Sequence, residues 1–422
     1  MRLERREVLR HLPHPVAESF AGTPSDWDIC SLDSLVESDS PICYGILMPG
    51  EDQPNGVPVV KVKNFDNGKI DISSLLRTTP EIDKEFRRSR LRCGDVLLSI
   101  RGSVGQVAIA CEELEEANIT QDTARIRLNG ECDHRFVFFA LQCGLLQRQI
   151  DLNTIGQAVK GINIGEVRRL ALPFPPLPEQ REIAAILSTW DRAIELNEKL
   201  IAAKQRRKHA LMQQLLTGKV RLPGFEKSVW KNCHLSDVAK NSTRRNVTSP
   251  DQATVYSVTN SVGMIPMDEG VIGENIERYK TVSHFDFAYN PMRINVGSIA
   301  MWDGKEDVLV SPDYVVFRCG PKLDAQFLEQ FRQTHYWRHF VTRAGGGSVR
   351  VRIYFNDLAA MKLNLPSLEE QKAIAAVLNA QDKELQLIER RLNALKQQKK
   401  GLMQQLLTGK ARVNVDAETV KG

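Results

Sequence analysis

The stretch Leu211-Met-Gln-Gln-Leu-Leu-Thr-Gly-Lys219 decides the architecture of this chain, because the same letters return as Leu402-Met-Gln-Gln-Leu-Leu-Thr-Gly-Lys410. The second copy lies 191 positions after the first. A repeat at a fixed offset indicates that a chain is built from related units. With 422 residues the chain is also longer than one hydrophobic core usually serves. The sequence therefore predicts two halves, each with its own core.

The composition is that of an ordinary globular protein, with 42% hydrophobic and 26% charged residues. No apolar run approaches the length of a membrane span, and the first ten residues mix charges where a signal peptide needs an apolar segment. We therefore expect a cytoplasmic protein without membrane contact. The eight cysteines contain no C-x2-C pair and are expected to be reduced thiols. The net charge of +5 is compatible with a polyanionic partner but does not identify one.

A long helix is predicted to precede the end of each repeat copy. Mostly apolar residues recur there at alternating spacings of four and three, which is typical of a coiled-coil seam. The polar exceptions are Asn197, Lys204 and Lys208 in the first helix and Gln381 and Lys399 in the second. The seam residues of the first helix are Ile183, Leu187, Trp190, Ile194, Ile201, Leu211 and Leu215. Those of the second are Ile374, Leu378, Leu385, Ile388, Leu392, Leu395, Leu402 and Leu406. Neither apolar seam is stable in water by itself, so we expect the two helices to pack together as an antiparallel coiled coil.

Local chemistry places the helix ends. Gly218 and Gly409 are suited to the left-handed conformation that stops a helix. Pro-Glu-Gln180 favours a helix start in the first copy, and Ser367 offers a side-chain cap in the second. The alternative arrangement, in which each helix packs on its own domain, remains open at this point.

The segments before the two helices are expected to be globular domains of the α+β class. Short apolar runs bounded by turn residues predict strands at 42–47, 57–62, 96–100 and 107–110, and a helix at 135–143. The predicted divisions are an N-terminal arm at 1–25, a first domain at 26–176, a helix at 177–218, a second domain at 219–366, a helix at 367–410 and a tail at 411–422. The arm is expected to be loose.

No catalytic or metal site is predicted. None of the Gly-Lys pairs is followed by Ser or Thr, so the sequence contains no P-loop. Asn290-Pro-Met-Arg293 begins like the Asn-Pro-Pro-aromatic motif of amino-methyltransferases, but it lacks the second proline and the ring. His335 and His339 share a helix face without a third ligand at metal-binding spacing.

Glycine-containing loops that carry cations are the candidate binding sites in both domains. Arginine forks onto guanine, asparagine onto adenine, and glycine lets the backbone approach a phosphate. In the first domain the candidates are Arg101, Gly102, Ser103, Gly105 and Lys160. In the second they are Arg293, Asn295, Gly297, Ser298, Arg350 and Arg352. The alternative is that the glycines serve hairpins and the cations are simply solvated.

Two diverged domains, each followed by a nearly repeated helix, resemble the DNA specificity subunit of type I restriction-modification systems. The resemblance rests on Pro-Leu-Pro-Glu-Gln-Arg-Glu-Ile-Ala-Ala-Ile-Leu187 at the helix entry, on the repeated Leu-Met-Gln-Gln-Leu-Leu-Thr-Gly-Lys219, and on Gly94-Asp-Val-Leu-Leu-Ser-Ile-Arg-Gly-Ser-Val-Gly105. It covers nearly the whole chain. Ser367-Leu-Glu-Glu-Gln371 departs from it by losing both prolines.

The resemblance implies two α/β target-recognition domains, separated by two long helices in an antiparallel coiled coil with pseudo-two-fold symmetry. Each domain would read one half of an asymmetric site in double-stranded DNA. The helices would set the spacer and dock two methyltransferase subunits, which a restriction (translocase) subunit joins. S-adenosylmethionine, ATP and Mg²⁺ would then belong to those partners, and this chain would not itself be an enzyme. A coiled-coil scaffold joining two protein-binding domains is the alternative.

Overall fold

The computed structural model describes residues 5–10, 12–246, 254–260, 262–268, 270, 272, 276–344 and 352–414. The chain divides into two compact units. The first unit combines residues 1–196 with 391–422, and the second comprises residues 197–390. Each unit therefore contains one globular domain and a part of each long helix.

The first domain is built on a four-stranded sheet with the order β2-β10-β7-β8. A three-stranded sheet, β6-β3-β9, and the pair β1–β11 accompany it. The strands are β1 Asp28–Ser31, β2 Cys43–Tyr44, β3 Val57–Val60, β6 Leu76–Thr78, β7 Val96–Ser99, β8 Val107–Ile109, β9 Asn118–Ile119, β10 Thr123–Ile126 and β11 Ala171–Phe174; β4 Phe65–Asp66 and β5 Lys69–Ile70 form a small hairpin. The helices are α3 Pro80–Glu85, α4 His134–Gln142, α5 Gly144–Leu152 and α6 Ile164–Arg169.

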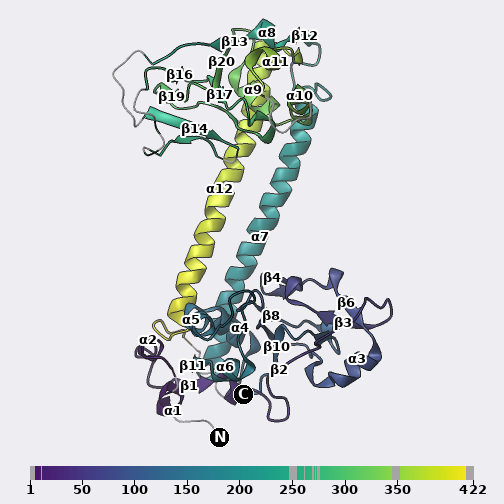
Figure 1. The fold of residues 1–422 in the computed structure, drawn as a ribbon, viewed down its shortest axis with the longest axis vertical. Helices are drawn as coiled ribbons and strands as arrows, with labels where there is room; N and C mark the ends of the chain where they lie inside the picture. Colours follow the sequence, from purple (N-terminus) through teal and green to yellow (C-terminus); the bar gives the residue numbers. More distant parts are fainter. Residues whose placement is uncertain are drawn as a thin grey trace. The chain divides into compact units, whose positions relative to one another are not determined.

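Each predicted strand of this domain is present, although β2 is shorter than expected. Helix α4 packs against β7 and β8 (Figure 1), because its apolar residues, such as Phe136, share one core with Val96 and Leu98 of β7. The α+β prediction is therefore confirmed for this half.

The prediction of a loose N-terminal arm is wrong for the described residues. The segment forms two short helices, α1 Arg5–Arg10 and α2 His14–Glu18. Val16 and Phe20 are buried in a small cluster with Ile29 of β1. Apolar side chains thus tie the arm to the β1–β11 pair, a contact that its polar and proline-punctuated composition did not reveal.

The second domain repeats the sheet of the first. Its four-stranded sheets have the orders β13-β20-β17-β18 and β15-β14-β19-β16, and β12 pairs with β21. The strands are β12 Lys231–His234, β13 Ala239–Ser242, β14 Val255–Thr259, β15 Gly263–Pro266, β16 Lys280–Val282, β17 Phe287–Tyr289, β18 Ile299–Met301, β19 Val308–Val310, β20 Val315–Cys319 and β21 Lys362–Leu365. The helices are α8 Leu235–Val238, α9 Ala325–Phe331, α10 His335–Ala344 and α11 Phe355–Ala359.

The strand registers of the two domains coincide. Val96 of β7 lies opposite Ile126 of β10, and Phe287 of β17 lies opposite Phe317 of β20. Both members of the second pair follow their counterparts by 191 positions. The internal repeat therefore extends from the helices into the sheets, where the sequences have diverged.

The long helices are α7, Leu177–Leu215, and α12, Leu368–Leu406. Gly218 and Gly409 follow them with φ of 72° and 73°, which confirms the predicted helix stops. The Ser367 hydroxyl accepts the N–H of Glu370 at 3.3 Å, as its capping role requires. None of the described residues forms a helix that is long and apolar enough to cross a membrane.

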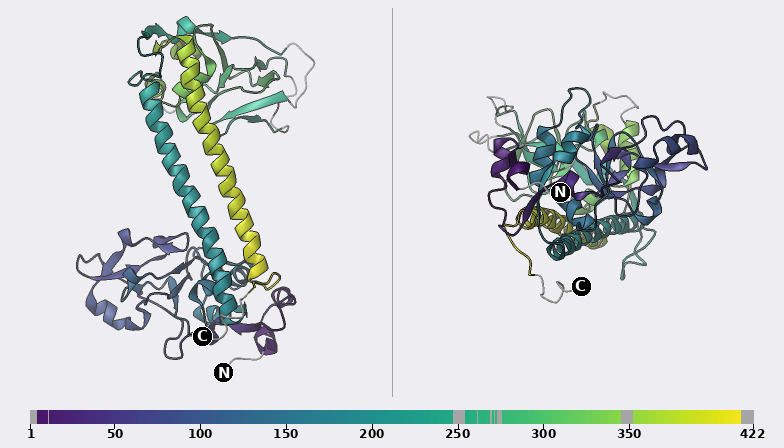
Figure 2. Two further views of the ribbon diagram at one scale, coloured as in Figure 1. Left: turned by 180° about the vertical axis from the view of Figure 1, so that it is seen from behind. Right: turned by 90° about the horizontal axis from the view of Figure 1, so that it is seen from below.

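Within each unit α7 and α12 lie side by side and run antiparallel (Figures 1 and 2). In the first unit Asp191 pairs with Lys399 at 2.5 Å, and in the second Lys208 pairs with Asp382 at 2.6 Å. These ion pairs are equivalent under the 191-residue repeat, and they give the polar seam residues Lys208 and Lys399 a partner on the other helix. All the predicted seam residues are buried or half-buried: Ile183, Leu187, Trp190, Ile194, Ile201, Leu211, Leu215, Ile374, Leu378, Leu385, Ile388, Leu392, Leu395, Leu402 and Leu406.

The repeated nonapeptide also packs into the domain cores. Met212, Leu215 and Leu216 belong to the core of the second domain, together with the first turns of α12. Met403, Leu406 and Leu407 belong to the core of the first domain, together with the first turns of α7. Each core thus contains the start of one long helix and the end of the other. The predicted antiparallel packing of the two helices on each other is therefore confirmed, and packing of each helix end into a domain core accompanies it.

Candidate nucleic-acid interface

The structure brings the two candidate loops of the first domain together. Arg101 forms a β-bridge with Gly161, and the N–H of Gly102 donates to the Lys160 carbonyl at 2.9 Å. The N–H of Ile162 donates to the Ile100 carbonyl at 2.9 Å. Gly102 has a φ of 72°, which a side chain there would strain. The sequence offered these loops separately, and the backbone joins them into one surface.

The side chains on this surface have different roles. Arg101, Ser103 and Lys160 are exposed, and Nη1 of Arg101 donates to the Gln121 side-chain oxygen at 2.9 Å. Gly105 has a φ of 92°, which a side chain there would strain. One arginine and one lysine therefore remain available to bases and phosphates.

The second domain repeats this junction. The N–H of Ile353 donates to the Pro291 carbonyl at 3.0 Å, which is the counterpart of the bond between Ile162 and Ile100 in the first domain. Arg293 and Asn295 are exposed on the turn that leads to Gly297, whose φ is 96°. Arginine and asparagine are the side chains that best distinguish guanine and adenine edges.

One candidate of this domain requires correction. Ser298 is only 4% exposed, and its hydroxyl donates to the Val258 carbonyl at 2.7 Å. The side chain therefore secures the turn and cannot reach a ligand at the surface. Arg350 lies outside the described residues, whereas Arg352 is described and exposed.

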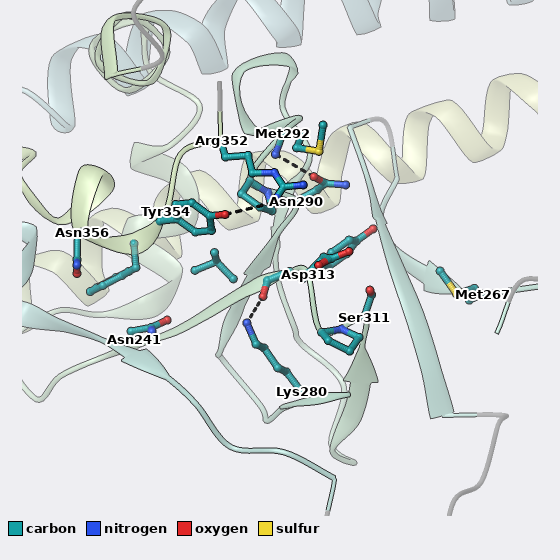
Figure 3. A pocket seen from close by; sticks show the side chains of 15 residues that line it. Asn241, Met267, Lys280, Asn290, Met292, Ser311, Asp313, Arg352, Tyr354 and Asn356 are labelled. Atoms are coloured by element: carbon teal, nitrogen blue, oxygen red, sulfur yellow. Dashed lines mark hydrogen bonds between the residues drawn. The ribbon is translucent and has the colours of Figure 1, made fainter. Parts of the chain in front are cut away.

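A cavity of about 460 Å³ lies beside this loop (Figure 3). Arg352, Tyr354, Lys280 and Asp313 are among its lining residues. Nη1 of Arg352 lies 3.5 Å from the Tyr354 hydroxyl oxygen. Burial is the main cause that lowers the pKa of Lys280. The Asn290 side-chain oxygen accepts the Met292 N–H at 2.9 Å, and Asn290, Pro291 and Met292 line the cavity.

Two further groups were missed because their partners are far apart in the sequence. Glu370, which is fully buried, accepts hydrogen bonds from Arg221 at 2.7 and 2.6 Å. The Arg221 guanidinium also lies 5.5 Å from the centre of the Trp230 ring. These contacts hold the start of α12 against the segment that follows α7. The glutamate of the helix-entry motif is therefore a structural residue.

The equivalent contact in the first unit has the same chemistry. Glu179 accepts from Arg412 at 2.8 and 2.9 Å, and from the Trp27 indole N–H at 2.9 Å. Asp26 also pairs with Arg412 at 2.8 Å. The repeat offset could have revealed both ion pairs from the sequence. Arg412 follows Arg221 by 191 positions, and Glu370 follows Glu179 by the same number.

The glutamine of the helix-entry motif also has a defined contact. The Gln180 side-chain oxygen accepts the N–H of Asp133, and the Gln371 oxygen accepts that of Asp324. The two aspartates cap α4 and α9, respectively. The motif therefore anchors each long helix to the adjacent helix of its domain.

The described part of the chain contains no group of three or more His, Cys, Asp and Glu side chains that could hold a metal ion. The candidate surface instead offers cations, amides and backbone N–H groups. That chemistry is suited to hydrogen bonding with bases and to neutralising phosphates.

Comparison with known proteins identifies the family. Residues 24–204 and 228–397 match the family described as "Type I restriction modification DNA specificity domain". The chain is 27% identical to the "Putative type I restriction enzyme MjaX specificity subunit" of Methanocaldococcus jannaschii, over 92% of this chain and 95% of that protein. It is 29% identical to the EcoBI specificity subunit of Escherichia coli, over 38% of this chain and 34% of that protein.

Solved structures show the same fold. The type I S subunit of M. genitalium superposes with a TM-score of 0.55 at 14% identity, covering 90% of this chain and 96% of that one. A chain from a study of the complex assembly of the type I restriction-modification system superposes with a TM-score of 0.56 at 18% identity, covering 92% and 99%. Since the family match spans more than half of the chain in two copies, this protein belongs to the type I restriction-modification DNA specificity family.

Proposed function

We propose that each globular domain reads one half of a bipartite, asymmetric sequence in double-stranded DNA. One observation carries this proposal: in both domains the same backbone hydrogen bond joins two loops, yet the exposed side chains on those loops differ. The first domain presents Arg101 and Lys160, and the second presents Arg293, Asn295 and Arg352. A common support with different side chains suits two readers of different base sequences.

We propose further that α7 and α12 set the spacing between the half-sites. A helix of 39 residues would be about 58 Å long at 1.5 Å per residue. Half-sites one turn of DNA apart are separated by about 34–36 Å. The ion pairs Asp191–Lys399 and Lys208–Asp382 support this role, because charged pairs within an apolar seam fix the register of the helices.

The partners in this proposal are two methyltransferase subunits, with a restriction (translocase) subunit joining them. Gln213 and Gln214 are exposed in the first repeat copy, as are Gln404 and Gln405 in the second. Identical exposed side chains at equivalent positions suit two identical partners. S-adenosylmethionine, ATP and Mg²⁺ would be bound by those partners.

The proposal is tested by isolating the full chain with its modification subunits and mapping the bases that the complex methylates. We expect a target with two defined halves and a gap of fixed length. Exchanging residues 219–366 for those of a related subunit should alter one half and preserve the other. A complex that assembles but binds DNA without sequence preference would favour the scaffold alternative.

A further inference from the structure

A second cationic feature of the first domain was not predicted from the sequence. A cavity of about 350 Å³ is lined by six arginines: Arg87, Arg88, Arg92, Arg125, Arg127 and Arg168. Arg87 and Arg88 come from the short helix Arg87–Ser89, and Arg92 from the segment that follows it. Arg125 and Arg127 come from β10 and its end, and Arg168 from α6. The segment 39–44 forms another wall. We call this cavity the arginine pocket.

Arg125 is the unusual member of the arginine pocket, because it is only 1% exposed. Nη1 donates to the Ser40 hydroxyl at 2.9 Å and Nη2 to the Pro41 carbonyl at 3.1 Å, both of which are neutral acceptors. Nε has no hydrogen-bond partner among the described residues. Arg127 also donates to the Ser40 hydroxyl, at 3.3 Å, so two guanidinium groups converge on one oxygen. A buried cation without a counter-ion is costly, and an anion in the pocket would remove that cost.

The carboxylates near the arginine pocket leave an excess of positive charge. Arg127 pairs with Asp95 at 2.8 Å, Arg168 with Asp33 at 3.5 Å and Arg92 with Glu37 at 3.6 Å. Asp39 also lines the cavity. Arg87 and Arg88 are exposed and form no ion pair within the described ranges.

The second domain shows that the fold does not require Arg125. The equivalent residue on β20 is Val316, which pairs with Ala288 as Arg125 pairs with Leu97. Val316 is fully buried in an apolar cluster. By contrast, the pair Asp95–Arg127 is retained as Asp286–Arg318 at 2.6 Å, so it belongs to the shared framework. The buried cation is therefore an addition specific to the first domain.

We propose that the arginine pocket binds a phosphate group, and that the DNA backbone is its expected source. An arginine guanidinium can donate two parallel hydrogen bonds to two oxygens of one phosphate group. Gln121, the hydrogen-bond partner of Arg101, lies in the turn before β10, and neither it nor Arg101 nor Lys160 lines the arginine pocket. The arginine pocket is therefore distinct from the loops that carry Arg101 and Lys160. Assignment of the phosphate to DNA rests on the proposed function.

The test compares Arg87→Gln/Arg88→Gln with Arg148→Gln/Arg181→Gln, which removes the same charge from exposed positions of the same unit. Each variant is prepared as the full chain in its modification complex, and DNA affinity is measured over a series of salt concentrations. Loss of one phosphate contact should reduce the slope of log affinity against log salt by about 0.9. We expect this reduction only in Arg87→Gln/Arg88→Gln, with unchanged sequence preference.

A second arm distinguishes free phosphate from DNA. The melting temperature of the full chain is measured in phosphate and in chloride at equal ionic strength, for wild type and for Arg125→Val, which installs the residue of the second domain. The pocket would be assigned to a free phosphate by two results together. Phosphate raises the melting temperature of the wild type but not of Arg125→Val, and Arg87→Gln/Arg88→Gln leaves the salt dependence of DNA affinity unchanged.

The proposal would be overturned if all variants had the same slope of log affinity against log salt and phosphate did not raise the melting temperature. It would also be overturned if both double variants reduced that slope equally. Failure of the proposed function is separately visible, because the wild-type complex would then lack sequence preference.

Discussion

Replacing Arg101 by alanine tests the assignment of the reading loops most directly. The side chain is exposed, and its described hydrogen bond is to the Gln121 side-chain oxygen at 2.9 Å. Removing such a surface side chain should change the free energy of unfolding by no more than about 0.5 kcal/mol. The backbone bonds from Gly102 and Ile162 that join the two loops do not involve it. Any effect on DNA can therefore be attributed to the lost guanidinium group.

A bidentate contact between arginine and guanine contributes about 1–3 kcal/mol of discrimination. Because 1.4 kcal/mol corresponds to a factor of ten, Arg101→Ala should reduce discrimination at one base pair by about 5- to 150-fold. The assay is methylation of a library of duplexes in which every position of the target is randomised, followed by sequencing of the modified fraction. We expect the loss in only one half of the target.

Two controls belong to this experiment. Arg293→Ala, at the equivalent turn of the second domain, should relax the other half of the target. Lys160→Ala should weaken binding to all sequences and reduce its salt dependence, as expected for a phosphate contact. Equal relaxation of both halves by Arg101→Ala, or none in either half, would refute the assignment of this loop.

Three other predictions follow from the helices and their contacts. Deleting one heptad at matched positions of α7 and α12 removes about 10 Å from each helix. The spacer should then shorten by about three base pairs while both half-sites stay intact. An unchanged spacer in methylation mapping would contradict the proposal that the helices set the spacing. Arg221→Met should lower the midpoint of urea unfolding, because it leaves the fully buried Glu370 without a cation. Arg412→Met should lower it less, since that arginine is 44% exposed, and the reverse order would contradict the argument. The hydrogen bond from Arg412 lowers the pKa of Asp26 below its usual 3.8. The pair therefore contributes stability above pH 3.8 that is lost as the pH falls through the lowered pKa. In acid unfolding experiments, the difference in stability between wild type and Arg412→Met should become smaller over that range.

Local chemistry accounts for the features that were predictable. A seam period of four and three requires only the geometry of one helix, and a glycine at Gly218 or Gly409 ends a helix through its own backbone freedom. The strands predicted at 96–100 and 107–110 follow from short apolar runs between turns. These patterns lie within a few residues of one another, so they can be read without knowing what the chain packs against.

The errors and omissions have a common cause. Ser298 was assigned to a binding loop because its neighbours are Asn295 and Gly297, whereas its hydroxyl donates to Val258 on another strand. The N-terminal arm is polar and proline-punctuated, but Phe20 packs in one cluster with Ile29 and with Ala171, which lies 151 positions further along the chain. Each outcome depends on a partner distant in the sequence.

The sequence by itself determined that this protein has two related halves, two long helices and glycine-containing cationic loops, because each of these is encoded by a repeat or by local periodicity. Only the tertiary structure decided which residues meet. It placed Arg101 beside Gly161, joined Arg221 to Glu370, and gathered Arg87, Arg125 and Arg168 around one cavity. The first two of these contacts join residues that are 60 and 149 positions apart, and the register of strands and helices that brings such residues together is set by the packing of the whole unit.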